Sequence, residues 1–199
     1  MSNADLAEMP TVRLSYCRRC GGAVRREWMP SESQRRDVCV SCRSIAYDNP
    51  ASLVACLVHA EGRLLLARRA IEPAKGRWFV PSGFVESRET LEDATVRELE
   101  EEVGLTAQPS LLSLYCVTSL PHMNEIYVIY RAALDRIPQT SAGPETTKIQ
   151  FFSRRDLPLQ ELAFRPFTEE FLGRFFDDEE RGHFPVRSHI VRASHASFL

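Results

Sequence analysis

The stretch GFVESRETLEDATVRELEEEVGL, from Gly83 to Leu105, decides how this chain folds. Thr90 followed by Asp93 has the spacing of a helix N-terminal cap, and Gly104 stands where a left-handed residue ends a helix. Between them, apolar side chains recur at helical spacing along one stripe: Val96, Leu99 and Val103. The stretch therefore predicts an amphipathic helix from near Thr90 to Gly104, with its apolar face packed on a sheet.

Three glutamates gather on a neighbouring arc of this predicted helix, at positions i, i+3 and i+4: Glu98, Glu101 and Glu102. Because like charges at these spacings repel, the arc is either a solvated acidic face or a cation-binding one. Carboxylate oxygens are the ligands that hard divalent cations prefer, above all Mg²⁺. Glu100 points roughly the opposite way, so we expect it to be solvated.

The complete pattern favours the cation-binding interpretation. The spacing G-x5-E-x7-R-E-L-x-E-E-x-G-L runs from Gly83 to Leu105 without a departure. It resembles the Nudix box, which in that family forms a loop–helix–loop that holds Mg²⁺ or Mn²⁺ against a diphosphate. The resemblance implies a hydrolase acting on a nucleoside diphosphate linked to another group. It also implies an α/β fold, the Nudix α/β/α sandwich with a mixed β-sheet.

The same resemblance assigns roles to individual residues. Arg97 would orient a catalytic glutamate, and Glu89 would pair with Arg97 to brace the motif. The expected ligands of the catalytic metal ion are Glu98, Glu101, Glu102 and Gly83.

Four cysteines upstream form a second motif, C-x2-C-x18-C-x2-C: Cys17, Cys20, Cys39 and Cys42. The spacing is that of a four-thiolate zinc site, in which the thiolates close a tetrahedral shell around the ion. Two redox pairs or two disulfides are the alternatives. We expect a structural Zn²⁺, because so small a module has too little core to fold without it. The motif thus predicts a small zinc ribbon.

Composition and charge limit the partners of the chain. It has 199 residues and a net charge of −2, with no apolar run long enough to span a membrane. Its first residues lack the pattern of a signal peptide, so we expect a cytoplasmic protein. We also expect a small nucleotide substrate, no membrane partner and no nucleic acid. A nucleic-acid-binding or nucleotide-sensing module stays as an alternative, because residues 17–43 carry seven arginines against three acids.

The order of the segments predicts the domain organisation. We expect a flexible N-terminus at 1–13, the zinc ribbon at 14–48, the Nudix hydrolase domain at 49–180 and a C-terminal tail at 181–199. Strands are predicted at 51–60, 63–67, 110–119, 125–133 and 148–153. A final helix opens at Pro166 and Thr168, with an apolar face made mostly of phenylalanines.

Beyond the box, the chain resembles a zinc-ribbon Nudix subfamily that includes ADP-ribose and FAD pyrophosphatases. The residues themselves do not indicate a quaternary structure; a homodimer is a candidate because many relatives in the ADP-ribose group are dimers. The resemblance runs through YCRRCGG, VCVSC, YDNP, WFVPSGFVE, SLPHMNEIYVIYRA, GPETTKIQFF, LAF and GHFPVRSH. The SQPW-type sequence of bacterial NADH pyrophosphatases is missing, although an NADH or NAD-capped RNA pyrophosphatase stays as the alternative. One departure is Lys148, where the subfamily pattern has an acid.

The resemblance also implies a mechanism. A water deprotonated by Glu98 or Glu145 would attack one phosphorus of FAD or ADP-ribose in line and release AMP. Glu145 is a candidate because it matches the first acid of the E-x-x-E pattern on its loop. The candidate substrate-binding residues are His122, Asn124, Arg68 and Phe164.

Overall fold

The computed structural model describes residues 16–165 and 167–191 of the chain. The expected flexible segment 1–13, Pro166 and the last part of the tail lie outside these residues. The chain divides into two compact units, with the boundary between Pro50 and Ala51. Within the described residues, no helix is both long and apolar enough to cross a membrane.

The first unit is a small antiparallel sheet. Its strands are β1 (Val24–Met29), β2 (Gln34–Cys39) and β3 (Ile45–Ala46), in the order β1-β2-β3. The two cysteine turns are closed by backbone hydrogen bonds: Cys17 N–H donates to Gly22 O at 2.8 Å, and Arg43 N–H to Cys39 O at 3.1 Å. These turns bring the ends of the ribbon together around the cysteines.

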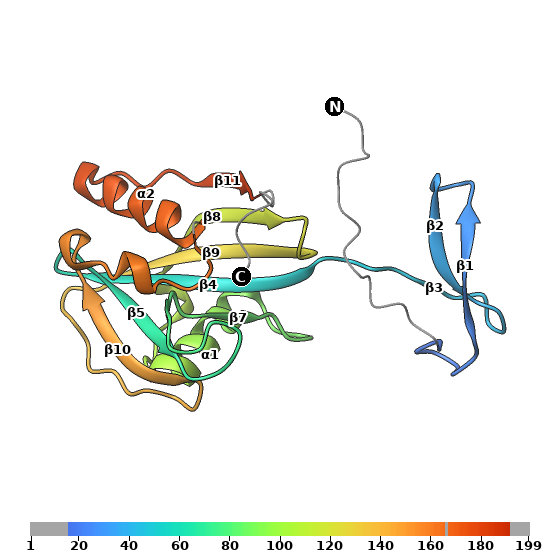
Figure 1. Ribbon diagram of the computed structural model, residues 1–199, viewed down its shortest axis with the longest axis horizontal. Helices are drawn as coiled ribbons and strands as arrows, with labels where there is room; N and C mark the ends of the chain where they lie inside the picture. The colour runs from blue at the N-terminus through green and yellow to red at the C-terminus, as the bar shows by residue number, and fades with distance from the viewer. Residues whose placement is uncertain (1–15, 166, 192–199) are drawn as a thin grey trace. The chain divides into compact units, whose positions relative to one another are not determined.

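The second unit is built on an eight-stranded mixed sheet (Figure 1). Its main order is β10-β5-β4-β9-β8-β11, while β6 pairs with β5 and β7 with β4. The pairs β4–β9 and β8–β11 are parallel, and the other pairs are antiparallel. The strands are β4 (Ala51–Ala60), β5 (Arg63–Arg69), β6 (Trp78–Phe79), β7 (Ser82–Phe84), β8 (Leu112–Leu120), β9 (Glu125–Ala133), β10 (Thr146–Phe152) and β11 (Arg187–Ile190).

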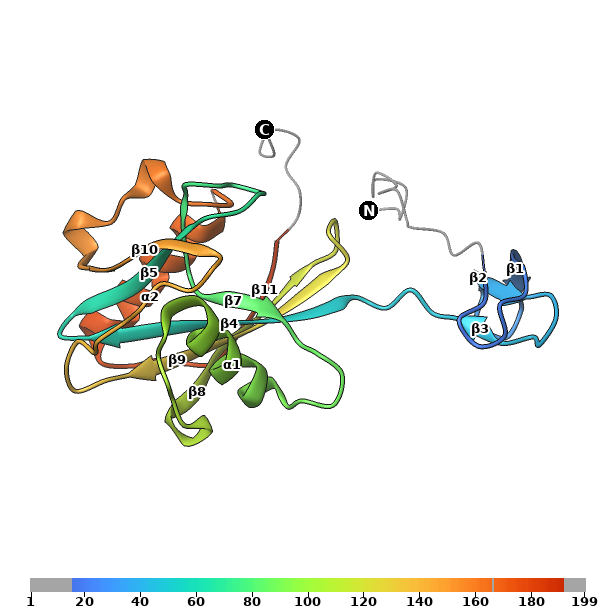
Figure 2. The same cartoon turned by 90° about the horizontal axis from the view of Figure 1, so that it is seen from below.

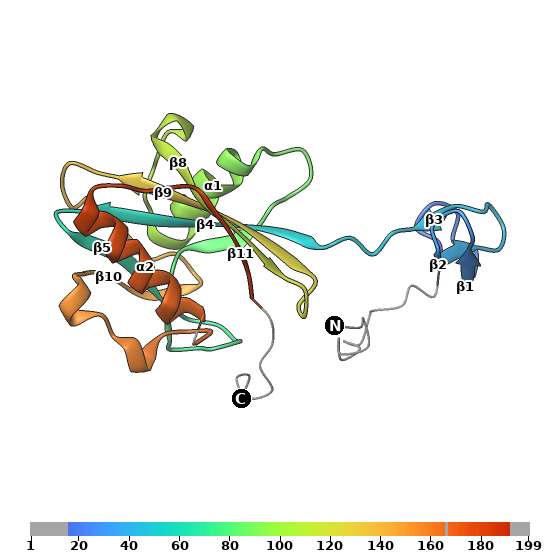
Figure 3. The same cartoon turned by 90° about the horizontal axis from the view of Figure 1, so that it is seen from above.

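A helix covers each face of this sheet. Helix α1 (Leu91–Val103) lies on one face, as Figure 2 shows from below, and α2 (Phe167–Arg181) lies on the other, as Figure 3 shows from above. Three short 3₁₀ turns join the elements, at Pro109–Leu111, Arg154–Asp156 and Leu159–Glu161. The predicted fold class, an α/β/α sandwich with a mixed sheet preceded by a zinc ribbon, is confirmed.

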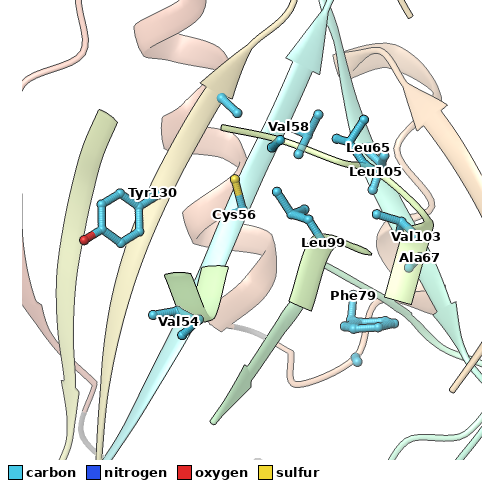
Figure 4. Close-up of a cluster of buried hydrophobic side chains, with 14 residues drawn as sticks. Val54, Cys56, Val58, Leu65, Ala67, Phe79, Leu99, Val103, Leu105 and Tyr130 are labelled. Atoms are coloured by element: carbon cyan, nitrogen blue, oxygen red, sulfur yellow. The ribbon is translucent and has the colours of Figure 1, made fainter. Parts of the chain in front are cut away.

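Strand β4 supplies both halves of the core, because successive side chains of a strand point to opposite faces. Val54, Cys56 and Val58 pack on the α1 side (Figure 4), where Leu99 and Val103 of the helix meet them. Ala55 and Leu57 lie in the other cluster, which contains four phenylalanines of α2 and its surroundings: Phe152, Phe171, Phe175 and Phe176. The ten-residue apolar run thus forms a strand that is buried on both sides.

The sheet opens between β4 and β5, and this opening places the box. The two strands pair only at His59–Leu64 and Ala60–Arg63. Nearer the start of β4, strand β7 pairs with it in place of β5, and Gly83 lies opposite Val54. The loop that enters β7 is anchored where Cys56 N–H donates to Pro81 O at 3.0 Å. The start of the box is therefore held against the central strand, next to α1.

The local signals for α1 are confirmed. The hydroxyl of Thr90 accepts the backbone N–H of Asp93 at 3.1 Å, and the carboxylate of Asp93 accepts the N–H of Thr90 at 3.4 Å. Gly104 ends the helix with φ of 64°, a left-handed conformation that costs glycine little. The glutamate arc is thereby fixed on a helix with defined ends.

The predicted strands and the final helix match the structure closely, and three strands of the second unit were not predicted: β6, β7 and β11. The strands at 51–60 and 125–133 have the predicted bounds, and no end of the others differs by more than two residues. Helix α2 begins at Phe167. Strand β11 lies inside the segment expected to be a tail, where it pairs in parallel with β8.

Candidate active site

The candidate active site begins where Gly83 meets Glu98. An added side-chain carbon at Gly83 would overlap all three terminal atoms of the Glu98 carboxylate. Only glycine lets the backbone approach this closely, because it has no Cβ. The start of the box and the middle of α1 therefore share one small space, with the Glu98 carboxylate against the backbone of Gly83.

Arg97 ties the loop to the helix. Its guanidinium donates to both carboxylate oxygens of Glu89, at 3.1 and 2.8 Å, and to the carbonyl of Phe84 at 2.9 Å. It also donates to Glu98 at 2.6 Å and to Glu101 at 3.2 Å. The hydrogen bond with Glu89 contributes most to raising the pKa of Arg97, and the bond with Glu98 adds to it. The guanidinium therefore stays charged. The predicted contacts of Arg97 with Glu89 and with a box glutamate are thus present.

Glu102 is the most buried acid of the box. Its side chain is 7% exposed, and one carboxylate oxygen accepts the backbone N–H of Ser82 at 2.9 Å. Burial raises its pKa to about 8 in spite of that hydrogen bond, and the nearby carboxylates of Glu98 and Glu145 act in the same direction. A positive charge beside this buried carboxylate would favour its ionised form.

Glu98 has a similar environment. Burial raises its pKa, the contact with Arg97 opposes the rise, and the negative charges of Glu101 and Glu145 add to it. Glu101 is more exposed, with 58% of its side chain accessible. Glu100 is exposed, as expected from its position on the helix. The three predicted ligands thus range from a buried carboxylate to one at the surface.

The loop that carries Glu145 is packed on the end of α1. Ser141 N–H donates to Val103 O at 3.0 Å, and Gly143 N–H donates to Glu102 O at 3.1 Å. A side chain at Gly143 would overlap the carbonyl oxygen of Glu101, so the loop needs glycine there. On its other side, Ala70 N–H donates to the carbonyl of Glu145 at 2.8 Å. The loop therefore brings Glu145 within electrostatic reach of Glu98 and Glu102.

This donor set fits a hard divalent cation. The predicted ligands are oxygens only, those of Glu98, Glu101, Glu102 and Gly83; among the described residues these carboxylates are not gathered within ligating distance of one another, so binding an ion would require side-chain adjustment. Burial raises the pKa of both Glu98 and Glu102, although Arg97 opposes the rise for Glu98 and the Ser82 N–H opposes it for Glu102. A cation bound among them would favour their ionised forms.

Of two neighbouring arginines, the structure brings Arg69 to the acidic cluster. Arg68 donates to Gly76 O at 2.6 Å and to Glu161 at 2.9 Å, and lies over Trp78 on the α2 side. Arg69 faces the other way, over Phe79 at 5.2 Å and Phe164 at 5.7 Å. Its charge opposes the rise in the pKa of Glu102. Of these two, the predicted substrate-binding residue was Arg68. Which of two consecutive strand residues faces the acidic cluster depends on the strand register, which the local sequence does not determine.

The other expected substrate-binding residues lie in two places. Phe164 is 41% exposed and is adjacent to Arg69. His122 and Asn124 lie between β8 and β9, where Ala51 N–H donates to the carbonyl of Asn124 at 2.8 Å. Lys148, the departure from the subfamily pattern, pairs with Arg68 in the sheet and lies over Trp78 at 5.7 Å. It is therefore on the face away from the box.

The four ribbon cysteines form a compact cluster. Their sulfurs all lie within 4.8 Å of one another, with Cys17 and Cys42 at 3.8 Å and Cys20 and Cys39 at 3.5 Å. A tetrahedron with zinc–sulfur bonds of about 2.3 Å has edges of about 3.8 Å, so the spacing fits a zinc ion. Backbone N–H groups of Arg19 and Cys42 also point at sulfurs, at 3.4 Å each, which suits thiolates.

Comparison with known families agrees with this geometry. The family model described as the NUDIX domain matches residues 49–175, and the model described as Nudix N-terminal, a zinc ribbon, matches residues 15–48. The chain belongs to the Nudix hydrolase family and carries an N-terminal zinc ribbon. Enzymes of this family use divalent metal ions and act on small nucleotide substrates.

Individual relatives show the same likeness. The chain is 36% identical over 121 residues to the ADP-ribose pyrophosphatase of Methanocaldococcus jannaschii, which covers 59% of this chain and 69% of that protein. It is 48% identical over 60 residues to phosphatase NudJ of Escherichia coli, covering 30% and 39% respectively. A NUDIX hydrolase structure from Nitrosomonas europaea superposes with a TM-score of 0.82 at 31% identity, covering 90% of this chain and all of that one.

Proposed function

We propose that this protein is a Mg²⁺-dependent pyrophosphohydrolase that cleaves ADP-ribose or FAD and releases AMP. The observation that carries the proposal is the shared space of Gly83, Glu98 and Glu102, braced by Arg97 and approached by Glu145. Two partly or largely buried carboxylates here lie next to a glycine backbone, with Arg97 paired to Glu98. Such a site suits a divalent cation that shares its coordination with a diphosphate.

Each box residue would have one task in binding. Glu98, Glu101, Glu102 and the carbonyl of Gly83 would hold Mg²⁺ or Mn²⁺. When bound, the metal ion would neutralise the negative charge of the diphosphate and the further charge that develops as it is cleaved. Arg97 would fix the orientation of Glu98 through the hydrogen bond of 2.6 Å, and Glu89 would keep Arg97 in place.

The reaction needs one proton acceptor. Glu98 or Glu145 would take a proton from a water molecule, whose oxygen then bonds to one phosphorus in line as the bridging oxygen leaves. With ADP-ribose the products are AMP and ribose phosphate, and with FAD they are AMP and FMN. Water is the only co-substrate, so the bonds balance without a further reactant.

The substrate assignment rests on the likeness to the archaeal ADP-ribose pyrophosphatase and on the mouth of the site. Arg69 lies between Phe79 and Phe164, close enough to Glu102 to affect its charge. A guanidinium in this place can bind a substrate phosphate, while the exposed ring of Phe164 offers a surface for a flat base. Arg68, His122 and Asn124 stay candidates for the more distant part of the substrate. The enzyme would act as a cytoplasmic homodimer.

The test is a substrate panel with Mg²⁺ and with Mn²⁺, in which AMP release is measured from FAD, ADP-ribose, NADH, NAD and diadenosine polyphosphates. Preference for ADP-ribose or FAD supports the proposal. A folded, zinc-loaded protein that releases AMP from neither would disprove it.

The same assay distinguishes Glu145 from Glu98 as the proton acceptor. If Glu145 takes the proton, Glu145→Gln lowers kcat roughly 10²- to 10⁴-fold and leaves the Mg²⁺ concentration for half-maximal rate unchanged. Glu98→Gln would change both quantities, because Glu98 is also a proposed ligand. A Glu145→Gln protein with full turnover would leave Glu98 as the acceptor.

A further inference from the structure

The positive charge of the ribbon is only partly balanced within it. Three of its seven arginines form ion pairs: Arg26 with Asp37 at 3.5 Å, Arg36 with Glu32 at 2.8 Å and Arg43 with Glu27 at 2.8 Å. These pairs use every carboxylate between positions 17 and 43. Within the described part of the chain, four ribbon arginines have no carboxylate partner: Arg18, Arg19, Arg25 and Arg35.

An exposed tryptophan lies among these arginines. Trp28 is in β1 and is 55% exposed, whereas Trp78, the other tryptophan of the chain, is 4% exposed. An exposed indole offers a large, flat surface to a ligand, and tryptophan is enriched where proteins bind partners. Arg36 lies over the ring of Tyr47 at 4.8 Å, but among the described residues no cation lies over Trp28. The indole is therefore open to a ligand.

The register of the ribbon puts Trp28 between two arginines. Arg35 is directly opposite Trp28 across the β1–β2 pair, and Arg26 is two residues away on the same strand, opposite Asp37. Opposite and next-but-one residues share one face of a sheet, with opposite Cβ atoms about 5 Å apart. We call this face, formed by Arg26, Trp28, Arg35 and Asp37, the Trp28 face; Arg26 pairs with Asp37 on it, and Arg35 has no carboxylate partner among the described residues. Glu27, with its partner Arg43, points to the other face.

We propose that the Trp28 face of the ribbon binds single-stranded nucleic acid. An open indole stacks on a nucleobase, the unpaired guanidinium of Arg35 binds a neighbouring phosphate, and a second phosphate competes with Asp37 for the exposed guanidinium of Arg26. A duplex hides the faces of its bases, and an acidic polypeptide has no base to stack, so neither uses all three side chains. The charge of the whole chain, −2, argues against nucleic acid, but positions 17–43 carry seven arginines against three carboxylates, an excess of positive charge that remains after the −2 of a zinc tetrathiolate is counted. Binding here requires no hydrolysis, so the inference goes beyond the proposed function.

The experiment uses the full chain with zinc bound and no added Mg²⁺. Single-stranded oligoadenylate is titrated at low salt while tryptophan emission is recorded, and the signal of a Trp28→Phe protein is subtracted to isolate Trp28. We expect quenching that saturates, weakens steeply with salt and is much smaller for a duplex of the same length. Absence of quenching at low salt would disprove the proposal.

Three variants, measured by anisotropy of a labelled oligoadenylate, test the face itself. Trp28→Ala should weaken binding at least about tenfold, because the base loses its stacking surface. Arg35→Ala should weaken binding and lower the salt slope by about one. Arg43→Ala removes the same charge from the opposite face and is the matched control, so it should have a clearly smaller effect. Zinc content and circular dichroism confirm that each variant is folded.

Three outcomes would contradict the assignment to nucleic acid. Equal losses from Arg35→Ala and Arg43→Ala would show diffuse charge attraction in place of a built surface. If polyglutamate quenches Trp28 and competes as well as oligoadenylate does, the ligand is an acidic polypeptide. Protection of Trp28 from acrylamide in the free protein would show that the chain itself covers the face. Each result would overturn the nucleic-acid assignment.

Discussion

The carboxylate of Glu98 lies so close to the backbone of Gly83 that a methyl group on Gly83 would displace it. Gly83→Ala should therefore move a proposed metal ligand without disturbing the core. We expect a loss of turnover of at least about tenfold and a higher Mg²⁺ requirement. Gly173→Ala is the control, because nothing lies within 4 Å of its added carbon and the residue is helical. The control should keep full activity and unfold at the same or a slightly higher temperature.

The contacts of Arg97 predict that a lysine cannot replace it. Lysine keeps the charge but cannot bond to Glu89, Glu98 and the carbonyl of Phe84 together. Arg97→Lys should lower kcat/KM by roughly 10- to 100-fold.

The pairing of Arg97 with Glu89 is tested by a double-mutant cycle. Glu89→Gln should also impair the enzyme, and the double variant should lose less than the product of the two single losses. Strictly multiplicative losses would show that the two residues act independently.

Burial of Glu102 predicts a large effect of a small change. Glu102→Gln keeps the shape of the side chain but removes the charge that the cation would meet. We expect turnover to fall by on the order of 100-fold or more at saturating Mg²⁺, with the fold preserved. Glu100→Gln on the exposed side of the same helix is the matched control and should be nearly neutral. Equal activity of the two variants would remove Glu102 from the metal site.

The local signals made the centre of the fold predictable. Helix α1 carries its own start, stop and apolar stripe, at Thr90, Gly104 and Leu99, so neighbours in sequence decide its limits. The largely apolar run of ten residues in β4 predicts a buried strand, and the structure buries it on both faces. The cysteine spacing predicted a cluster that the structure forms. For the helix and the strand, the deciding signals lie close together in the sequence. For the cysteines, the residue type and spacing are compatible with few kinds of site.

Contacts between distant residues account for what the sequence missed. Strand β11 has only four residues and alternates half-buried with exposed side chains, so its local pattern resembles a polar tail. It is held by Arg187, which binds the Asp178 carboxylate at 2.6 and 2.7 Å. The choice between Arg68 and Arg69 depends on the register of β5, and the approach of Glu145 depends on Gly143 packing on α1. None of these relationships has a local signature.

The cysteine cluster predicts that zinc maintains the ribbon only. One Zn²⁺ per chain should be found by metal analysis, and a chelator should abolish the β-structure of the ribbon. Because residues from Ala51 onward form a separate compact unit, the unfolding temperature of the Nudix domain should hardly change. Cys20→Ser should reproduce the effect of the chelator. If zinc loss unfolds both units together, the ribbon is required for the stability of the enzyme domain.

The buried pair of Asp178 and Arg187 predicts a stability effect that depends on pH. Burial opposes ionisation of Asp178, but hydrogen bonds from Arg187 and from Tyr115 outweigh it, so its pKa lies below the ordinary value. The pair therefore stabilises the fold above the unfolded-state pKa of about 3.9, and this contribution is lost as the pH falls further. Asp178→Asn should reduce the free energy of unfolding by about 1–3 kcal/mol at pH 7.

The neighbouring surface pair provides the control for this prediction. Asp177 binds Arg154 at 2.6 Å with both side chains more than 40% exposed, so Asp177→Asn should change stability little. Urea denaturation of the three proteins between pH 7 and pH 3 tests both statements. The difference between the wild type and Asp178→Asn should shrink below about pH 4, as Asp178 itself becomes neutral. A difference that stays constant down to pH 3 would show that packing of the side chain, and not its charge, holds β11 in the sheet.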